Sequence, residues 1–114
     1  MHDQLSSTFQ AMSDPARRAI LTQLTHGTAT VGELSEPLEL TAPAVSHHLK
    51  VLERAGLVTR RVMGQHRMIS LEPGQLQQAA GWLEDLKRFW EESFGRLDAE
   101  LAAQADQSKE ASDE

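Results

Sequence analysis

The sequence contains no cysteine and no tyrosine, and its aromatic residues are two tryptophans and three phenylalanines among 114 residues. Without cysteine, the chain can form neither a disulfide framework nor a thiolate metal site. No apolar run reaches the roughly eighteen residues of a membrane-spanning helix, and the start lacks the basic and apolar regions of a secretory signal. We therefore expect a cytoplasmic protein that does not bind membranes.

The chain also lacks the residue patterns on which most enzymes depend. We find no nucleophile–base set, no glycine-rich phosphate loop and no paired carboxylates in an expected cleft. The Ser46-His47 pair lies on one helix and does not make a triad. We therefore expect neither an enzyme nor a bound cofactor, and the length fits a single domain with a modest core.

Basic residues are few, and the net charge is −6, which at first argues against a nucleic-acid partner. The distribution answers this objection. Residues 41–70 contain five basic residues and one acidic residue, giving +4, whereas residues 72–114 contain four basic and eleven acidic residues, giving −7. Because the local field decides what a surface attracts, residues 41–70 can bind DNA while the acidic part faces away.

Residues 41–57 have clear helix start and stop signals. The hydroxyl of Thr41 can cap the first turn, Pro43 falls where a missing N–H costs little, and Gly56 suits the left-handed position after a helix. At about 100° per residue, Val45 and Leu49 share one apolar face with Leu52. The opposite face suits a reader of the major groove, although most amphipathic helices only expose such a face to water; it comprises Pro43, Ser46, His47, Lys50 and Arg54.

A basic hairpin is predicted directly after this helix. Residues 57–63 and 66–71 are rich in β-branched and apolar residues, and Gly64-Gln65 fits a two-residue turn. Arg60, Arg61 and Arg67 lie on the two strands. A helix-turn-helix followed by such a hairpin is a winged helix.

Three shorter helices are predicted before residue 41. The first covers residues 3–12, and the second begins at Pro15 and ends at His26-Gly27. The third follows a capping box, in which Thr30 has a glutamate three residues later, and Pro37 should end or distort this helix near Glu36.

Several polar side chains have alternative roles. Arg17 and Arg18 could contact phosphate, but a solvated position is favoured. His47 lies on the exposed side of its helix, whereas His48 lies at the margin of the buried side, where a packed, hydrogen-bonded histidine is favoured. No histidine pair has the i, i+4 spacing of a helical zinc site.

A long helix is predicted from Gln75 to about Ala103. Its apolar residues form a narrow stripe at near-heptad spacing, and Trp82 and Phe89 form a second line beside it. Two lines indicate two contact surfaces, so we favour dimerisation over a single wide core stripe. Residues 104–114 are expected to be a disordered acidic tail. The stripe consists of Leu76, Ala79, Leu83, Leu86, Trp90, Phe94, Leu97 and Leu101.

Over about residues 5 to 101 the chain resembles the ArsR/SmtB-type winged-helix transcriptional regulators. It looks most like the branch without metal ligands, since residues 33–36 lack cysteine and the last helix lacks histidine. Ala42 and His47 depart from the family pattern at positions that help to read bases, so the operator sequence cannot be carried over. The hairpin has Met68-Ile69 where tyrosine is frequent in the family, so the packing of the wing cannot be carried over either. The resemblance is carried by Asp14–Leu21, Val31–Leu34, Pro43–Glu53, Ala55–Val58, Trp82-Leu83 and Phe89–Glu91.

The resemblance implies a mainly α fold with a small β-hairpin, ordered α-α-α-α-β-β-α, with a long C-terminal dimerisation helix. Residues 1–103 would form the DNA-binding and dimerisation domain. The implied function is that of a homodimeric repressor, not responsive to metals, which binds an inverted-repeat operator in double-stranded DNA near its own or an adjacent gene. The alternative is a protein-interaction module without sequence-specific DNA binding. The identity of the effector stays open between a small apolar molecule, a partner protein and no effector at all.

Two sets of residues carry this prediction. The predicted DNA contacts are Thr41, Ala42, Pro43, Ser46, His47, Lys50, Arg61, Gln65 and Arg67. The predicted dimer interface comprises Leu5, Phe9, Trp82, Leu83, Leu86, Phe89, Trp90, Phe94 and Leu97.

Overall fold

The computed structural model describes residues 3–112, and it describes side chains as far as residue 106. The chain divides into two compact units, residues 1–79 and residues 80–114. Within the described residues, no helix is both long enough and apolar enough to cross a membrane.

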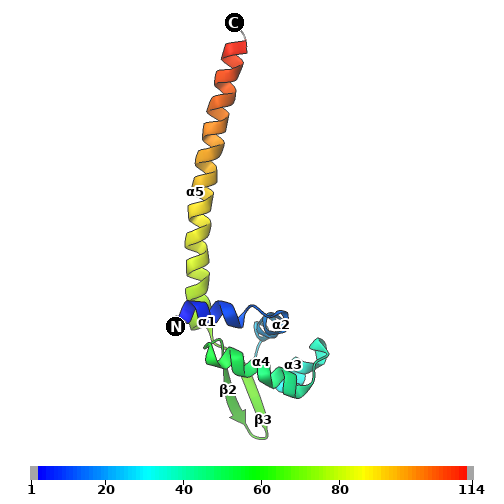
Figure 1. Cartoon of the computed structure of the whole chain (residues 1–114). Helices are drawn as coiled ribbons and strands as arrows, with labels where there is room; N and C mark the ends of the chain where they lie inside the picture. Colours follow the sequence, from blue (N-terminus) through cyan, green and yellow to red (C-terminus); the bar gives the residue numbers. More distant parts are fainter. Residues whose placement is uncertain (1–2, 113–114) are drawn as a thin grey trace. The chain divides into compact units, whose positions relative to one another are not determined.

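The first unit carries four helices and a three-stranded antiparallel sheet of order β1-β3-β2, and a fifth helix starts at its end (Figure 1). The predicted winged helix-turn-helix order is confirmed. One strand, β1, was not predicted, because its two residues are too short to show an alternating pattern. The elements are α1 (Gln4–Ala11), α2 (Pro15–Leu24), β1 (Ala29–Thr30), α3 (Val31–Leu38), α4 (Ala42–Arg54), β2 (Val58–Met63), β3 (His66–Leu71) and α5 (Pro73–Ser112).

The helices of the first unit begin where side chains satisfy free backbone N–H groups. The N–H of Ala44 donates to the Thr41 hydroxyl at 3.3 Å, which fixes the start of α4. The capping box of α3 is confirmed: the N–H of Glu33 donates to the Thr30 hydroxyl, and the N–H of Thr30 donates to the Glu33 carboxylate, both at 3.2 Å.

The predicted end of the third helix near Glu36 is wrong by two residues, since α3 continues to Leu38. Pro37 lies in the last turn, where the N–H that it lacks removes a single helical bond and no later turn is interrupted. The helix stops at Glu39, which adopts a left-handed conformation with φ of 55°.

The last helix extends further than predicted. It was expected to end near Ala103, but α5 continues to Ser112 and includes most of the segment expected to be a disordered tail. Residues 104–112 contain no proline or glycine, and six of the nine are alanine, glutamine, glutamate or lysine, which have high helix propensity. Residues 113–114 lie outside the described part of the chain.

The core of the first unit is built around the apolar face of α4. The side chains of Val45, Leu49 and Leu52 have no exposed surface, as predicted, and they pack with buried residues of α2, α3 and the sheet. Burial of each leucine contributes about 1.5–3 kcal/mol. Figure 1 shows α3 and the β2–β3 hairpin beside α4. The other members of this core are Ala11, Ile20, Leu21, Leu24, Leu34, Ala55, Leu57, Val58 and Ile69.

This packing predicts a large loss of stability when the buried face of α4 is truncated. We expect Leu49→Ala to lower the free energy of unfolding by about 2–5 kcal/mol, because it removes buried methyl groups and leaves a cavity. The neighbouring Lys50→Ala, at an exposed position, should change it by less than about 0.5 kcal/mol. Urea unfolding at one fixed protein concentration measures both values, and equal losses would contradict this account of the core.

Candidate nucleic-acid interface

The exposed face of α4 carries a continuous polar stripe. Pro43, His47, Lys50 and Arg54 are all exposed, and steps of three and four residues place them along one side of the helix. The first turn contains no acidic residue. Arg54 was assigned to this face from the sequence but was not counted among the DNA contacts, and the structure gives it the same exposed setting as Lys50.

The start of α4 presents the remaining predicted contacts of this helix. Thr41 and Ala42 are exposed, while Ser46 is half-buried at the edge of the stripe. Because Thr41 caps the helix, its backbone position is fixed relative to the first turn. The helix start and the stripe together make one exposed surface that could enter a groove.

The two arginines of the hairpin lie on opposite faces of the sheet. Arg61 is paired with Met68, and Arg67 is paired with Val62. Partners share a face and successive residues alternate, so Arg61 and Arg67 point to opposite sides. Both are exposed, as is Gln65 in the turn.

Arg60 differs from the other basic residues of this region. Its Nε donates to Oε1 of Glu53 at 2.7 Å, so strand β2 is tied to the last turn of α4. The predicted DNA contacts include Arg61 and leave out Arg60, but the sequence gives no sign that Glu53 is the partner of Arg60. The net charge of +4 in residues 41–70 therefore rests on four exposed side chains: Lys50, Arg54, Arg61 and Arg67.

Arg17 and Arg18 take a role that the sequence did not suggest. Arg17 donates through Nε to the carbonyl of Ala11 at 2.6 Å, and Arg18 donates through Nη1 to the carbonyl of Met12 at 2.8 Å. The favoured prediction, solvation alone, was therefore incomplete: both guanidinium groups satisfy carbonyls that the end of α1 leaves free.

His48 is packed against the start of α2, as predicted. Its Nδ1 lies 3.4 Å from Nη1 of Arg17 and 3.9 Å from the Asp14 carboxylate. The carboxylate of Asp14 also accepts the N–H groups of Arg17 at 3.1 Å and Ala16 at 2.9 Å, and the hydrogen bond from Arg17 contributes most to holding the pKa of Asp14 below 3.8.

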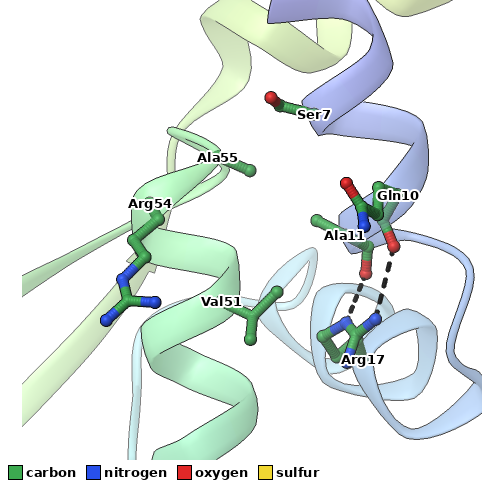
Figure 2. Close-up of a pocket in the computed structure, with 7 residues that line it drawn as sticks. All are labelled: Ser7, Gln10, Ala11, Arg17, Val51, Arg54 and Ala55. Carbon is green, nitrogen blue, oxygen red and sulfur yellow. Dashed lines mark hydrogen bonds between the residues drawn. The ribbon is translucent and has the colours of Figure 1, made fainter. Parts of the chain in front are cut away.

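A surface hollow of about 370 Å³ lies between α1, α2 and α4 (Figure 2). Arg17 borders it and is held by the carbonyls of Gln10 and Ala11. Alanine and valine side chains make most of its apolar wall, and Ser7 and Gln10 supply polar atoms from α1. Figure 2 shows the guanidinium group of Arg54 directed away from Arg17. The positive charges of Arg17 and Arg54 therefore do not lie together in this hollow.

The second unit exposes a row of large apolar side chains. From 38% to 57% of their surface is accessible, and three aromatic rings contact one another, with Trp90 5.8 Å from Phe89 and 5.7 Å from Phe94 between ring centroids. Leu5 and Phe9, the other two residues of the predicted dimer interface, are half-buried on α1. The exposed row consists of Trp82, Leu83, Leu86, Phe89, Trp90, Phe94, Leu97 and Leu101.

The arrangement of the first unit defines a class of protein. A capped α4 follows α3 after a short turn, exposes a basic stripe and is followed at once by a basic hairpin. This is the winged helix-turn-helix, in which the second helix of the pair lies in the major groove.

Comparisons with known proteins give the family. A profile described as a helix-turn-helix domain matches residues 12–61. The chain is 48% identical over 82 residues to the HTH-type transcriptional regulator Rv2034 of Mycobacterium tuberculosis, covering 72% of this chain and 74% of that protein. It is 35% identical over 79 residues to the transcriptional repressor SdpR of Bacillus subtilis, covering 69% and 88%.

Solved structures agree. The ArsR family transcriptional regulator RHA00566 is 35% identical and superimposes with a TM-score of 0.71, over 78% of this chain and 98% of that one. The chain therefore belongs to the ArsR/SmtB family of winged helix-turn-helix, DNA-binding transcriptional regulators. These relatives are regulators and not enzymes, which argues against an enzymatic activity.

The capping role of Asp14 predicts a pH-dependent contribution to stability. Its lowered pKa means that the charged cap stabilises the fold above the unfolded pKa and loses this effect as pH falls through the folded value. Asp14→Asn should lower the unfolding temperature at pH 7, and this difference should shrink below pH 3.8. Thermal unfolding from pH 7 to pH 3 measures it, with Asp98→Asn on α5 as the control. An unchanged difference at every pH would contradict the assignment.

Proposed function

We propose that this protein is a homodimeric repressor that binds an inverted-repeat operator near its own or an adjacent gene. The observation that carries the proposal is the exposed stripe of α4, which combines hydrogen-bonding and basic side chains on the outer face of a rigidly packed helix. Such a helix can reach base edges while its apolar face stays in the core. Because a transcriptional regulator acts where the DNA is, the proposal includes a cytoplasmic location.

In this proposal, α4 and the β2–β3 hairpin contact different parts of the DNA. Ser46, His47 and Lys50 reach base edges, while Thr41, Ala42 and Pro43 bring the helix start close to the groove. The hairpin meets the phosphate backbone. Since Arg61 and Arg67 point to opposite sides of the hairpin, a wing that lies edge-on to the minor groove offers one arginine to each strand, with Gln65 at the tip.

The exposed row on α5 supports the homodimer. Large apolar side chains in one contiguous row are unusual on a monomer and mark an interaction surface. A second copy of the same helix offers the matching row, and two-fold symmetry then gives two copies of α4 for two half-sites about one DNA turn apart. We include Leu5 and Phe9 of α1 in this interface.

Repression without a metal signal is the remaining part of the proposal. Residues 33–36 of α3 have no cysteine, and α5 has no histidine. Among the described residues, no group of three or more histidine, aspartate or glutamate side chains is placed to hold a metal ion. A small apolar molecule or a partner protein is then the effector, if the protein has one.

Substitutions of the base-reading residues of α4 and of the phosphate-binding residues of the hairpin should change DNA binding in different ways. We expect His47→Ala or Lys50→Ala to cost about 1–3 kcal/mol at the operator and to relax the preference at particular bases. Arg67→Ala should weaken binding to any sequence and reduce the salt-dependence slope by about one unit. Competition binding with operator and random DNA at several salt concentrations measures both effects.

The control for this experiment is Lys87→Ala, which removes the same charge as Lys50→Ala from an exposed position on α5. It should leave both affinity and preference unchanged. If the α4 variants still discriminate fully between operator and random DNA while Arg67→Ala does not, α4 is not the element that reads the base sequence. If the wild-type chain shows no preference at all for DNA upstream of its own gene, the protein-interaction module becomes the better explanation.

The dimer should depend on the row of α5. We expect Trp90→Glu combined with Leu97→Glu to yield a monomer and to weaken DNA binding, because each change places a charge in an apolar contact. Ala99→Glu, about half a turn from this row, should leave the dimer intact. Sedimentation equilibrium at micromolar concentration distinguishes the two results. A wild-type chain that sediments as a monomer would show that the interface is wrongly assigned.

A further inference from the structure

The ion pair between Glu53 and Arg60 connects the two parts of the proposed DNA-binding surface. Glu53 lies in the last turn of α4, and Arg60 is the third residue of β2. The side chains are 32% and 21% exposed, so the pair is partly shielded from water, and its Nε–Oε1 distance of 2.7 Å is that of a strong, charge-assisted hydrogen bond.

The position of Arg60 in the sheet is unusual for a charged residue. It is paired with Ile69, which is completely buried, and so it lies on the face of the hairpin that packs toward the core. Its Nη2 is buried and has no hydrogen-bond partner among the described residues. A buried donor without a partner lowers stability, and apolar side chains of similar size often stabilise such a position better. Stability alone therefore explains this arginine poorly.

Each partner of the ion pair is followed by an exposed arginine of the basic surface. Arg54 follows Glu53 at the end of α4, and Arg61 follows Arg60 on the outer face of β2. Because neighbouring residues in a strand point to opposite faces, holding Arg60 inward directs Arg61 outward. The bond between Arg60 and Glu53 therefore adds a direct link between the wing and α4 to the sheet pairing and core packing that already hold the hairpin.

We propose that Arg60 is a positioning residue, which uses its bond to Glu53 to hold the wing at a fixed angle to α4 so that Arg61 meets the phosphate backbone while α4 is in the major groove. This inference rests on the proposed DNA-reading function. Without this bond the wing would have more freedom relative to α4, and the entropic cost of ordering it at the moment of binding would reduce the benefit of the Arg61 contact.

A double-mutant cycle tests the coupling between Arg60 and Arg61. The Glu53→Met, Arg60→Met double variant replaces the pair by two apolar side chains of similar length and leaves neither charge unpaired, so it should remain folded. Arg61→Ala is then added to the wild type and to this double variant, and operator affinity is measured for all four proteins. Thermal unfolding of each protein is recorded in parallel.

We expect Arg61→Ala to weaken operator binding about tenfold in the wild type and about twofold or less in the double variant, because residues that act through one another are not additive. Arg60→Lys keeps a charge that can reach Glu53 and should restore at least part of the Arg61 effect. Thr59→Ala, the neighbour on the other side of Arg60, is the control and should show no coupling. If the Glu53–Arg60 pair had a structural role alone, its replacement would change the unfolding temperature but not the loss of operator affinity caused by Arg61→Ala.

The outcomes separate this inference from the proposed function. If Arg61→Ala costs the same in the double variant as in the wild type, Arg60 does not position the wing, although α4 and the wing still bind DNA. If Arg61→Ala has no effect in the wild type, the wing does not contact phosphate through Arg61, and both the inference and that part of the proposed function are wrong. Should the double variant melt below the measuring temperature, the Glu53→Gln, Arg60→Met double variant, which keeps a polar side chain at the more exposed of the two positions, takes its place with the same Arg61→Ala arm.

Discussion

Burial of one face of α4 is the constraint on which the rest of the first unit depends. Val45, Leu49 and Leu52 lose all contact with water, and this fixes the rotation of the helix about its own axis. The opposite face, with His47 and Lys50, must then point outward. A DNA-reading surface needs side chains at fixed positions, and the core supplies that rigidity without any contact of its own to DNA.

In the folded first unit, one group of basic side chains bonds to other groups of the protein and another group stays exposed. Arg17 and Arg18 satisfy carbonyls at the end of α1, and Arg60 bonds to Glu53. Lys50 and Arg54 of α4, with Arg61 and Arg67 of the hairpin, stay exposed. A protein with a net charge of −6 can therefore belong to a DNA-binding family, since residues 41–70 carry a net charge of +4 while eight of the 17 acidic residues lie on α5.

The division into two units also separates two kinds of apolar surface. In the first unit, apolar side chains fill a closed core, whereas α5 exposes a row that includes Trp90, Phe94 and Leu97. The core is closed within one chain, whereas the exposed row is the surface that the proposed dimer would cover. Family membership rests on the first unit, where residues 12–61 match the helix-turn-helix profile, while the proposed dimer rests on the second.

The order of the helices and of the two hairpin strands, the caps at Thr30 and Thr41 and the buried face of α4 could all be predicted from the sequence, because these depend on residues a few positions apart. It placed the ends of helices less well: Pro37 sits inside α3 and α5 runs on to Ser112, because a boundary balances several small local terms. The fold alone showed which basic side chains have a partner within the protein. Arg60 and Arg61 are adjacent and chemically identical, and what separates them is the register with β3 and the approach of Glu53 from another element.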